Sequence, residues 1–147
     1  MTDLDNRLGA LVERLEKASG PDRELDADVC RLFNAAVERR SVLGKTVWLQ
    51  NVLKPPMESW HSVPHYTSSI DSALTLVLEG FTRAVDATAP EAGIDVELFG
   101  PYTVERRQHT GRIYVEDSNK HTLITAEATA TVIAALRSRL SSQPQEK

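Results

Sequence analysis

Apolar residues recur at helical spacing in four stretches of the chain, and each stretch predicts a helix. The first covers about residues 3–18, with Leu4, Leu8, Leu11, Val12 and Leu15 on one stripe. The second follows directly after Ser19 and Gly20, and its stripe is Leu25, Val29, Leu32, Phe33, Ala36 and Val37. Because the connection is so short, we expect these two helices to form a hairpin that shares its apolar faces.

The third helix is expected to begin at Ser68, after a stop at Pro64, which keeps His65 and its neighbours out of an incoming helix. Ser68 and Asp71 stand three residues apart and predict an N-terminal cap. The apolar stripe and the closing glycine are Ile70, Ala73, Leu74, Val77 and Gly80. The fourth helix is predicted over 126–140, with Thr125 as its cap and the stripe Ala126, Ala130, Ile133, Leu136 and Leu140.

After residue 80 the pattern becomes alternating, which is typical of strands. The alternating segments are 81–86, 94–99 and 113–115, with a loop expected from Pro101 to Gly111. Because residues 87–93 are too few for a crossover helix, the first two strands should pair in antiparallel fashion. These elements predict an α/β domain of the α+β type. In it, a small antiparallel sheet of three or four strands packs against the central and final helices, and the N-terminal helical hairpin is added.

Residues 38–63 show no clear period. The segment 47–53 fits either a strand or a helical turn, and Pro55-Pro56 prevents either from continuing. Both tryptophans of the chain, Trp48 and Trp60, lie in this region. They are expected either to fill the core or to form a platform for a ligand or a partner.

The length of 147 residues fits a single domain over 1–140, followed by a tail at 141–147 with too few apolar residues to pack. No apolar run approaches the roughly 20 residues of a membrane helix, and the N-terminus lacks the pattern of a secretory signal. We therefore expect a cytoplasmic protein that neither spans a membrane nor anchors to one. The net charge of -4 disfavours nucleic acid as a partner, because binding to a phosphate backbone requires a basic surface.

The sequence carries no familiar catalytic or metal-binding signature. It has no Gly-x-Ser-x-Gly, Gly-x-Gly-x-x-Gly or Walker motif. His61 and His65 are four residues apart, but Pro64 between them prevents the regular helix that would put both on one face. Cys30 is the single cysteine and is expected to fill the core. We predict no catalytic residue, metal site or cofactor, and a hydrolase of unrecognised geometry stays open as an alternative.

One group of basic residues is concentrated in the acidic chain: Arg106, Arg107, His109 and Arg112. Clustered arginines can bind phosphate or carboxylate groups through paired hydrogen bonds. A helix start at Ser68 and Ser69 offers free backbone amides to the same anion, and the ring of Tyr66 offers a stacking surface. The predicted ligand-binding residues are therefore Tyr66, Ser68, Ser69, Arg106, Arg107, His109 and Arg112. The alternatives are a solvated loop for the arginines and plain capping for the serines.

Two motifs and the final helix resemble a known family. They are Gly20-Pro21-Asp22-Arg23-Glu24-Leu25-Asp26, Pro64-His65-Tyr66-Thr67-Ser68-Ser69-Ile70-Asp71-Ser72-Ala73 and the Ala-rich end Ala134-Ala135-Leu136-Arg137-Ser138-Arg139. These landmarks are similar to those of small phage and prophage proteins with the phage ABA-sandwich domain, and the resemblance spans about residues 4–140. Where that family has a tryptophan-rich strand, this chain has Phe81-Thr82-Arg83-Ala84-Val85. The resemblance implies a phage origin and an α/β fold, and the family itself has no assigned function.

Two classes of function follow from these features. The first is a non-enzymatic phage accessory protein that binds a small anionic ligand, such as a nucleotide signal used in host defence. The second is an interaction or assembly factor whose segment between Trp48 and Trp60 binds a host or virion protein. In either class we expect a homo-oligomer, most simply a dimer, because exposed strand edges and two tryptophans leave much surface to protect.

Overall fold

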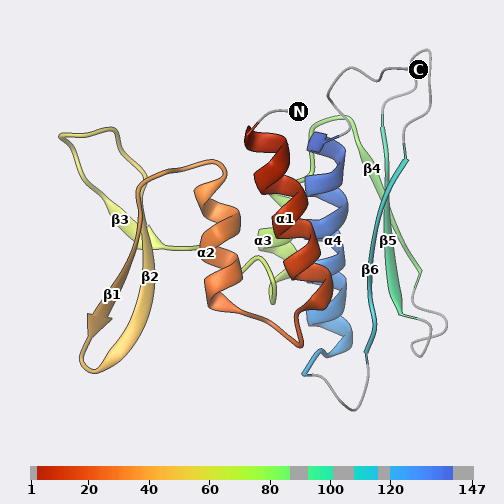
Figure 1. Ribbon diagram of the computed structural model, residues 1–147, viewed down its shortest axis with the longest axis horizontal. Helices are drawn as coiled ribbons and strands as arrows, with labels where there is room; N and C mark the ends of the chain where they lie inside the picture. The colour runs from red at the N-terminus through yellow and green to blue at the C-terminus, as the bar shows by residue number, and fades with distance from the viewer. Residues whose placement is uncertain (1–2, 87–92, 101–107, 116–119, 141–147) are drawn as a thin grey trace.

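The computed structural model describes residues 3–86, 93–100, 108–115 and 120–140 of the chain, which form helices and two antiparallel sheets (Figure 1). The helices are α1 (Asp3–Lys17), α2 (Arg23–Arg31), α3 (Ile70–Leu74) and α4 (Leu123–Leu140). The first sheet has the order β1-β2-β3 and contains β1 (Val37–Val42), β2 (Lys45–Asn51) and β3 (Trp60–Ser62). The second has the order β4-β5-β6 and contains β4 (Thr82–Asp86), β5 (Ile94–Phe99) and β6 (Gln108–Ile113). This arrangement confirms the predicted α+β class.

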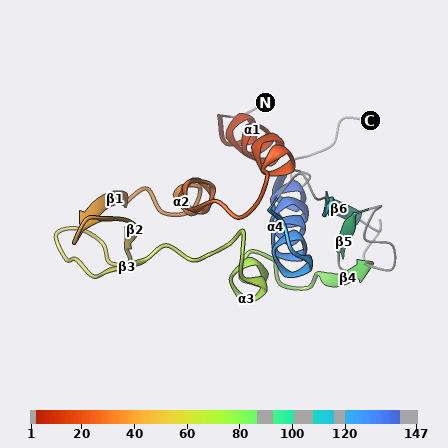
Figure 2. The same ribbon diagram turned by 90° about the horizontal axis from the view of Figure 1, so that it is seen from below.

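Helix α4 is the central element, and α1, α3 and the second sheet pack around it (Figure 2). Every residue from 128 to 136 is buried, including the polar Thr129 and Thr131. The predicted single apolar stripe is therefore too narrow, because a helix that is covered on all sides is apolar all round. Its many alanines let the surrounding elements approach closely.

The second sheet lays one face on α4. Along β5 the side chains of Ile94, Val96 and Leu98 are buried and alternate with half-buried ones. β4 and β5 pair antiparallel, from Thr82 opposite Phe99 to Asp86 opposite Asp95, as predicted. On β6 the position of Gly111 has no room for a side chain, since a Cβ there would overlap the carbonyl oxygen of Ala130. The backbones of β6 and α4 are thus in direct contact.

The first sheet was not predicted as a sheet, but of the two alternatives for 47–53 the strand is the one that the structure shows, as β2. It lies at the end of the molecule away from α4, with α2 beside it (Figures 1 and 2). Val37 opens β1 instead of closing the second helix, because the chain turns at Asn34. The Asn34 side chain accepts a hydrogen bond from Ala36 N–H at 3.0 Å and donates to the Asn51 carbonyl at 2.9 Å. These bonds replace the helical ones and direct the chain into β1.

Several predicted boundaries also differ. Helix α3 is shorter than expected, and its N-cap is Ser69 instead of Ser68. Helix α4 begins at Leu123, and its start is closed by a reciprocal pair: Thr125 N–H donates to the Thr122 hydroxyl at 3.2 Å, and Thr122 N–H donates to the Thr125 hydroxyl at 2.9 Å. The third strand of the second sheet occupies 108–113, so it begins inside the predicted loop and ends before 115.

The predicted tail at 141–147 and two of the predicted ligand residues, Arg106 and Arg107, lie outside the described residues. None of the helices in the described part of the chain is long and apolar enough to cross a membrane. Cys30 is 3% exposed, as expected for a core residue, and burial raises the pKa of its thiol.

Candidate functional site

The start of α3, where the sequence predicted an anion site, is a short helix that is capped by its own serine. Tyr66 is 7% exposed, and burial raises the pKa of its phenol to about 12. The Ser69 hydroxyl accepts a hydrogen bond from Ser72 N–H at 3.2 Å, so it serves as the cap of α3. Ser68 is half-buried beside it. A helix of this length with its own cap in place leaves little for a ligand, and the predicted stacking ring lies in the core.

The basic residues on β6 point in opposite directions. His109 is opposite the buried Leu98, on the face that covers α4, and its ring centroid lies 5.9 Å from that of Phe81. Arg112 is opposite Asp95 on the outer face and forms an ion pair with it, with Nη2 and Oδ2 2.6 Å apart. This hydrogen bonding raises the pKa of Arg112. His109 and Arg112 therefore cannot converge on one ligand. The role of Arg106 and Arg107, outside the described residues, stays a prediction.

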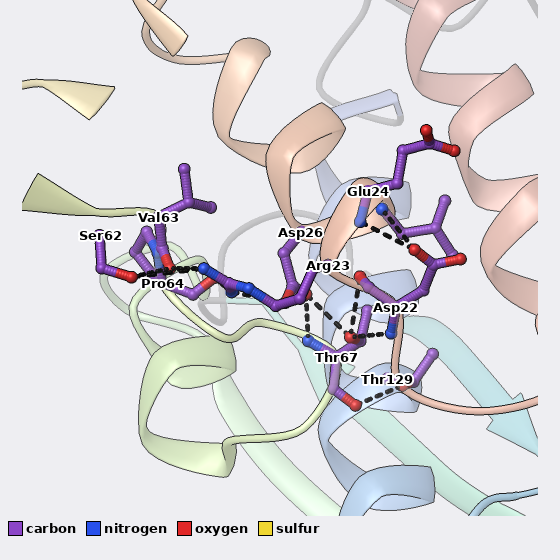
Figure 3. Close-up of polar contacts among 10 residues, drawn as sticks. Asp22, Arg23, Glu24, Asp26, Ser62, Val63, Pro64, Thr67 and Thr129 are labelled. Atoms are coloured by element: carbon purple, nitrogen blue, oxygen red, sulfur yellow. Dashed lines mark hydrogen bonds and ion pairs between the residues drawn. The ribbon is translucent and has the colours of Figure 1, made fainter. Parts of the chain in front are cut away.

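The two distinctive motifs meet at a buried carboxylate (Figure 3). Asp26 is 1% exposed, and its Oδ1 accepts hydrogen bonds from the N–H and the hydroxyl of Thr67, both at 2.8 Å. Its Oδ2 accepts a third hydrogen bond, from Arg23 at 2.8 Å. A buried carboxylate with three donors is fully supported by its own surroundings.

Further bonds extend this cluster to neighbouring elements (Figure 3). Asp22 caps α2 by accepting from Glu24 N–H at 2.8 Å, and its own N–H donates to the Thr67 hydroxyl at 2.9 Å. Arg23 also donates to the carbonyl of Val63 at 2.8 Å. The Thr129 hydroxyl of α4 donates to the Thr67 carbonyl at 3.1 Å. The two motifs thus join α2, the segment before α3, and α4, and their polar residues are engaged in holding the fold together.

A groove of about 240 Å³ between α1 and α2 is a better candidate for a ligand site. Its lining consists of Arg7, Ala10, Leu11, Arg14, Asp28, Arg31 and Leu32. Arg7 and Arg14 are seven residues apart, about two helical turns, and therefore lie on the same face of α1. Arg31 belongs to the last turn of α2.

The charges in this groove are arranged around Asp28. Its Oδ2 lies 2.8 Å from Nη1 of Arg14, and its Oδ1 lies 2.7 Å from Nη1 of Arg31. Arg7 reaches toward the same place and donates to the Arg31 carbonyl at 3.5 Å. Three guanidiniums and one carboxylate leave a surplus of two positive charges in the lining. This surplus favours an anion, and Asp28 holds two of the three cations in place before any ligand arrives.

The tryptophans lie on opposite faces of the first sheet. Trp60 is opposite Asn51 in the strand register, so its side chain lies on the same face as that of Asn51. Trp48 and Asn51 are three residues apart in β2, and their side chains therefore point to opposite faces. Trp48 lies on the α2 side, where the Arg31 guanidinium is 5.2 Å from the ring centroid. Trp60 lies on the open face, with the Arg40 guanidinium at 4.4 Å. Both rings are half-buried and each contacts a cation, which is an arrangement worth about 0.5–1 kcal/mol at exposed sites.

Other candidate chemistry is weaker. The Ser59 hydroxyl lies 2.9 Å from Nε2 of His61 on the surface, but the adjacent carboxylate of Glu58 accepts from the Trp60 indole at 2.7 Å and does not orient the histidine. In the part of the chain that the structure describes, no group of three or more His, Cys, Asp or Glu side chains is placed to hold a metal ion.

Comparisons with known proteins found no matching family model, no matching curated protein and no matching solved structure. The resemblance to phage proteins therefore rests on the motifs quoted from the sequence.

Sequence reasoning missed the groove because its three arginines come from two helices. Arg7 and Arg14 were available as a signal, since their spacing places two cations on the solvent side of a predicted helix. The position of Arg31 was less accessible, because the second helix was expected to continue to Val37. In the structure Arg31 lies in the last turn of α2, and the packing of α1 beside it adds a third guanidinium to the groove.

Proposed function

We propose that the protein is a non-enzymatic binding protein for a small anionic ligand, which it holds in the groove between α1 and α2. The observation that carries the proposal is the group of guanidiniums of Arg7, Arg14 and Arg31 around a space of about 240 Å³. Among the described lining residues, Asp28 supplies the one carboxylate.

The geometry supports a phosphate or carboxylate group as the bound part of the ligand. A guanidinium has five N–H donors, and Asp28 engages Arg14 and Arg31 through a single short contact each. The remaining donors can bind anionic oxygens in pairs. Leu11 and Leu32 add apolar surface to the same groove. The volume is below the roughly 300–1,000 Å³ of drug-sized sites, so a phosphate-bearing fragment fits better than a large ligand.

The resemblance to phage proteins points to a biological class for this ligand. A nucleotide signal of host defence carries the phosphates that the groove would bind, and a phage accessory protein would act by sequestering it in the host cytoplasm. No covalent chemistry is required for this role, which agrees with a sequence that carries no familiar catalytic signature.

Binding can be tested with purified protein and a panel of inorganic phosphate, pyrophosphate, mononucleotides, cyclic nucleotides and ADP-ribose. A ligand that binds the native state raises the melting temperature, and calorimetry then gives its affinity. The double variant Arg7→Ala/Arg14→Ala should weaken binding by about 10- to 100-fold, the size expected from losing charge-assisted contacts of about 1.5–3 kcal/mol. Both side chains project from the solvent side of α1, so the free protein should keep its stability.

Two further variants separate this groove from the site indicated by the sequence. Arg112→Ala removes a surface guanidinium that is paired with Asp95, and it should leave affinity unchanged. Arg106→Ala/Arg107→Ala tests the loop arginines directly. If this second pair abolishes binding while Arg7→Ala/Arg14→Ala does not, the ligand lies at the loop and the groove assignment is wrong. If no member of the panel binds, the proposed ligand class is wrong.

The alternative function, an interaction or assembly factor, is favoured by one specific observation. The first sheet stands at the end of the molecule, and the segments that connect its strands expose large apolar side chains: Leu43, Val52 and Met57. Capture of a host or virion protein that depends on this sheet, with no nucleotide bound, would support the alternative over the ligand proposal.

A further inference from the structure

The turn between β1 and β2 carries an unusual residue. Leu43 and Gly44 form a two-residue hairpin connection with φ values of 52° and 79°. Turns of this kind favour Asn, Asp or Gly at the first position, because a side chain such as leucine is strained at positive φ. Leu43 is also 98% exposed, so its side chain has no packing partner in the described part of the chain. A strained and fully exposed leucine is explained if its side chain contacts another molecule.

Strand β1 presents an open edge beside this turn. The Trp48 carbonyl accepts from Val63 N–H at 3.0 Å, so the backbone groups of Trp48 face β3. Arg39 is opposite Trp48 in the register, and its N–H and C=O therefore face away from β2. The backbone N–H and C=O of Ser41 and the carbonyl of Val37 face away from β2 in the same way, because these residues are two positions from Arg39. β1 is an outer strand of its sheet, and no other strand of the described chain pairs with this edge (Figure 1).

The charges along β1 select one partner for this edge. Glu38 and Arg40 lie on the same open face, with Glu38 Oε1 3.0 Å from Arg40 Nη2. If a second copy of the chain pairs antiparallel with Arg39 opposite its own equivalent, each Glu38 lies opposite Arg40 of the other copy. Two cross-strand pairs of opposite charge result. Together with the Glu38–Arg40 pair inside each strand, they form a ring of four side chains with alternating charges. Shifting the register by two residues places Arg40 against Arg40, or Glu38 against Glu38.

We infer that two copies of this chain associate through the outer edges of β1, with Arg39 at the two-fold axis, into one continuous six-stranded sheet. Arg39 exchanges both backbone hydrogen bonds with its copy, and each Ser41 N–H donates to the Val37 carbonyl of the other copy. On the α2 side of the sheet, Arg39 stands opposite Arg39 of the other copy. This is a hydrogen-bonded pair, in which the side chains are farther apart and can diverge into solvent.

The same register gives Leu43 a partner. Position 43 of one copy falls opposite position 35 of the other, so the turn lies beside the segment that leads into β1. That segment contains Ala35, which is exposed, and follows Phe33, which is 49% exposed. Val42, 49% exposed, is placed next to Ala36 of the other copy. Association would therefore cover the apolar residues at both ends of β1 and give the strained turn a function.

Charge reversal tests the register. Wild-type protein in sedimentation equilibrium at micromolar concentrations should show a species of twice 16.3 kDa. Glu38→Arg alone creates two Arg–Arg pairs and Arg40→Glu alone creates two Glu–Glu pairs, so each should raise the dimer dissociation constant by at least about tenfold. An equimolar mixture of the two variants restores opposite charges at both pairs and should form a heterodimer. The double variant Glu38→Arg/Arg40→Glu should dimerise with itself. Glu79→Arg, an exposed charge reversal away from β1, is the matched control and should have no effect.

Three further variants test the interface without reversing a charge. Leu43→Asn should weaken dimerisation while it keeps or raises the melting temperature, because asparagine tolerates positive φ better than leucine. Arg39→Cys should cross-link to its own copy under mild oxidation, since a hydrogen-bonded antiparallel pair has Cα atoms about 5.5 Å apart, within disulfide range. Arg40→Cys should not. A wild-type protein that sediments only at 16.3 kDa, or a dimer that is insensitive to both single reversals or cross-links at position 40, would overturn the inference.

Discussion

Replacing Asp26 tests the conclusion that the two distinctive motifs maintain the fold. Asp26→Ala removes a carboxylate that is 1% exposed and that accepts hydrogen bonds from Thr67 N–H, the Thr67 hydroxyl and Arg23. The substitution removes the acceptor of the Thr67 N–H, whereas Arg23 keeps the Val63 carbonyl at 2.8 Å and the Thr67 hydroxyl has the Asp22 carbonyl at 3.4 Å. Thr67 is fully buried, so water cannot readily replace the carboxylate there. The Arg23 side chain is 32% exposed and can turn toward solvent.

These contacts set the size of the effect. Removing one member of a buried charge pair typically costs about 3–5 kcal/mol, because the other charge is left uncompensated. The partial exposure of Arg23 reduces that cost, whereas the buried Thr67 N–H adds the price of an unsatisfied donor, about 1–3 kcal/mol. We expect Asp26→Ala to lower the free energy of unfolding by about 3–4 kcal/mol. Asp26→Asn keeps an oxygen for Thr67 and should cost about half as much.

Urea denaturation followed by circular dichroism measures both values. Glu79→Ala, which removes an exposed carboxylate, should change the free energy of unfolding by less than about 0.5 kcal/mol. Thr67→Val removes the hydroxyl alone, and in combination with Asp26→Ala it should be clearly non-additive because the two residues share hydrogen bonds. A loss below about 1 kcal/mol for Asp26→Ala, accompanied by a loss of ligand affinity, would refute the structural role and make Asp26 a binding residue.

Two other predictions concern packing and pH. Gly111→Ala should destabilise the protein by about 3 kcal/mol or more in the same denaturation assay, because its Cβ would overlap the Ala130 carbonyl oxygen. Gly9→Ala in α1, where a Cβ meets nothing within 4 Å, should instead stabilise the protein by about 0.5–1 kcal/mol. Equal effects of the two substitutions would contradict the close contact of β6 with α4. The Tyr66 phenol has a pKa of about 12 in the folded chain and about 10 when unfolded, so the folded state retains the proton to higher pH. The contribution of Tyr66 to the free energy of unfolding is therefore complete below pH 10. It is lost as the pH rises toward 12, at about 1.4 kcal/mol per pH unit. Tyr66→Phe should remove this alkaline loss, measured as the difference between variant and wild type at pH 9 and 11, and parallel curves for the two proteins would show that Tyr66 is not buried in solution.

The sequence predicted the bounds of a helix or strand correctly where a regular apolar pattern ended at a clear helix- or strand-breaking residue. Helix α1 was predicted to within a residue at each end, since its stripe is regular and Gly20 follows it. Strand β5 was predicted with the correct bounds, because one of its faces lies on α4 and the burial therefore alternates. The second helix was expected directly after Ser19 and Gly20, and Asp22 caps α2 there by accepting from Glu24 N–H and Leu25 N–H.

Other parts were beyond the reach of the pattern. The first sheet is exposed over most of β1, so its strands carry polar and charged residues on both faces and no alternation develops. The end of α2 depends on bonds from Asn34 to Ala36 and Asn51, and the latter contact is long-range. The opposite orientation of His109 and Arg112 depends on strand register, which a loop prediction over 101–111 could not supply. The basic groove exists through the packing of α1 against α2, which no local signal describes.

The two proposals use different residues, and the side chain of Arg31 lies between the two places. Arg7 and Arg14 belong to the groove alone, and Glu38 and Arg40 belong to the β1 edge alone, so either proposal can fail without the other. Arg31 connects them, because its guanidinium bonds Asp28 in the groove and lies 5.2 Å from the ring of Trp48 on the first sheet. Trp48 is in turn opposite Arg39, the residue placed at the two-fold axis. A ligand affinity that differs between wild type and Glu38→Arg would show that the two places are coupled, because linkage requires dimerisation to change ligand affinity by the factor by which the ligand changes dimerisation.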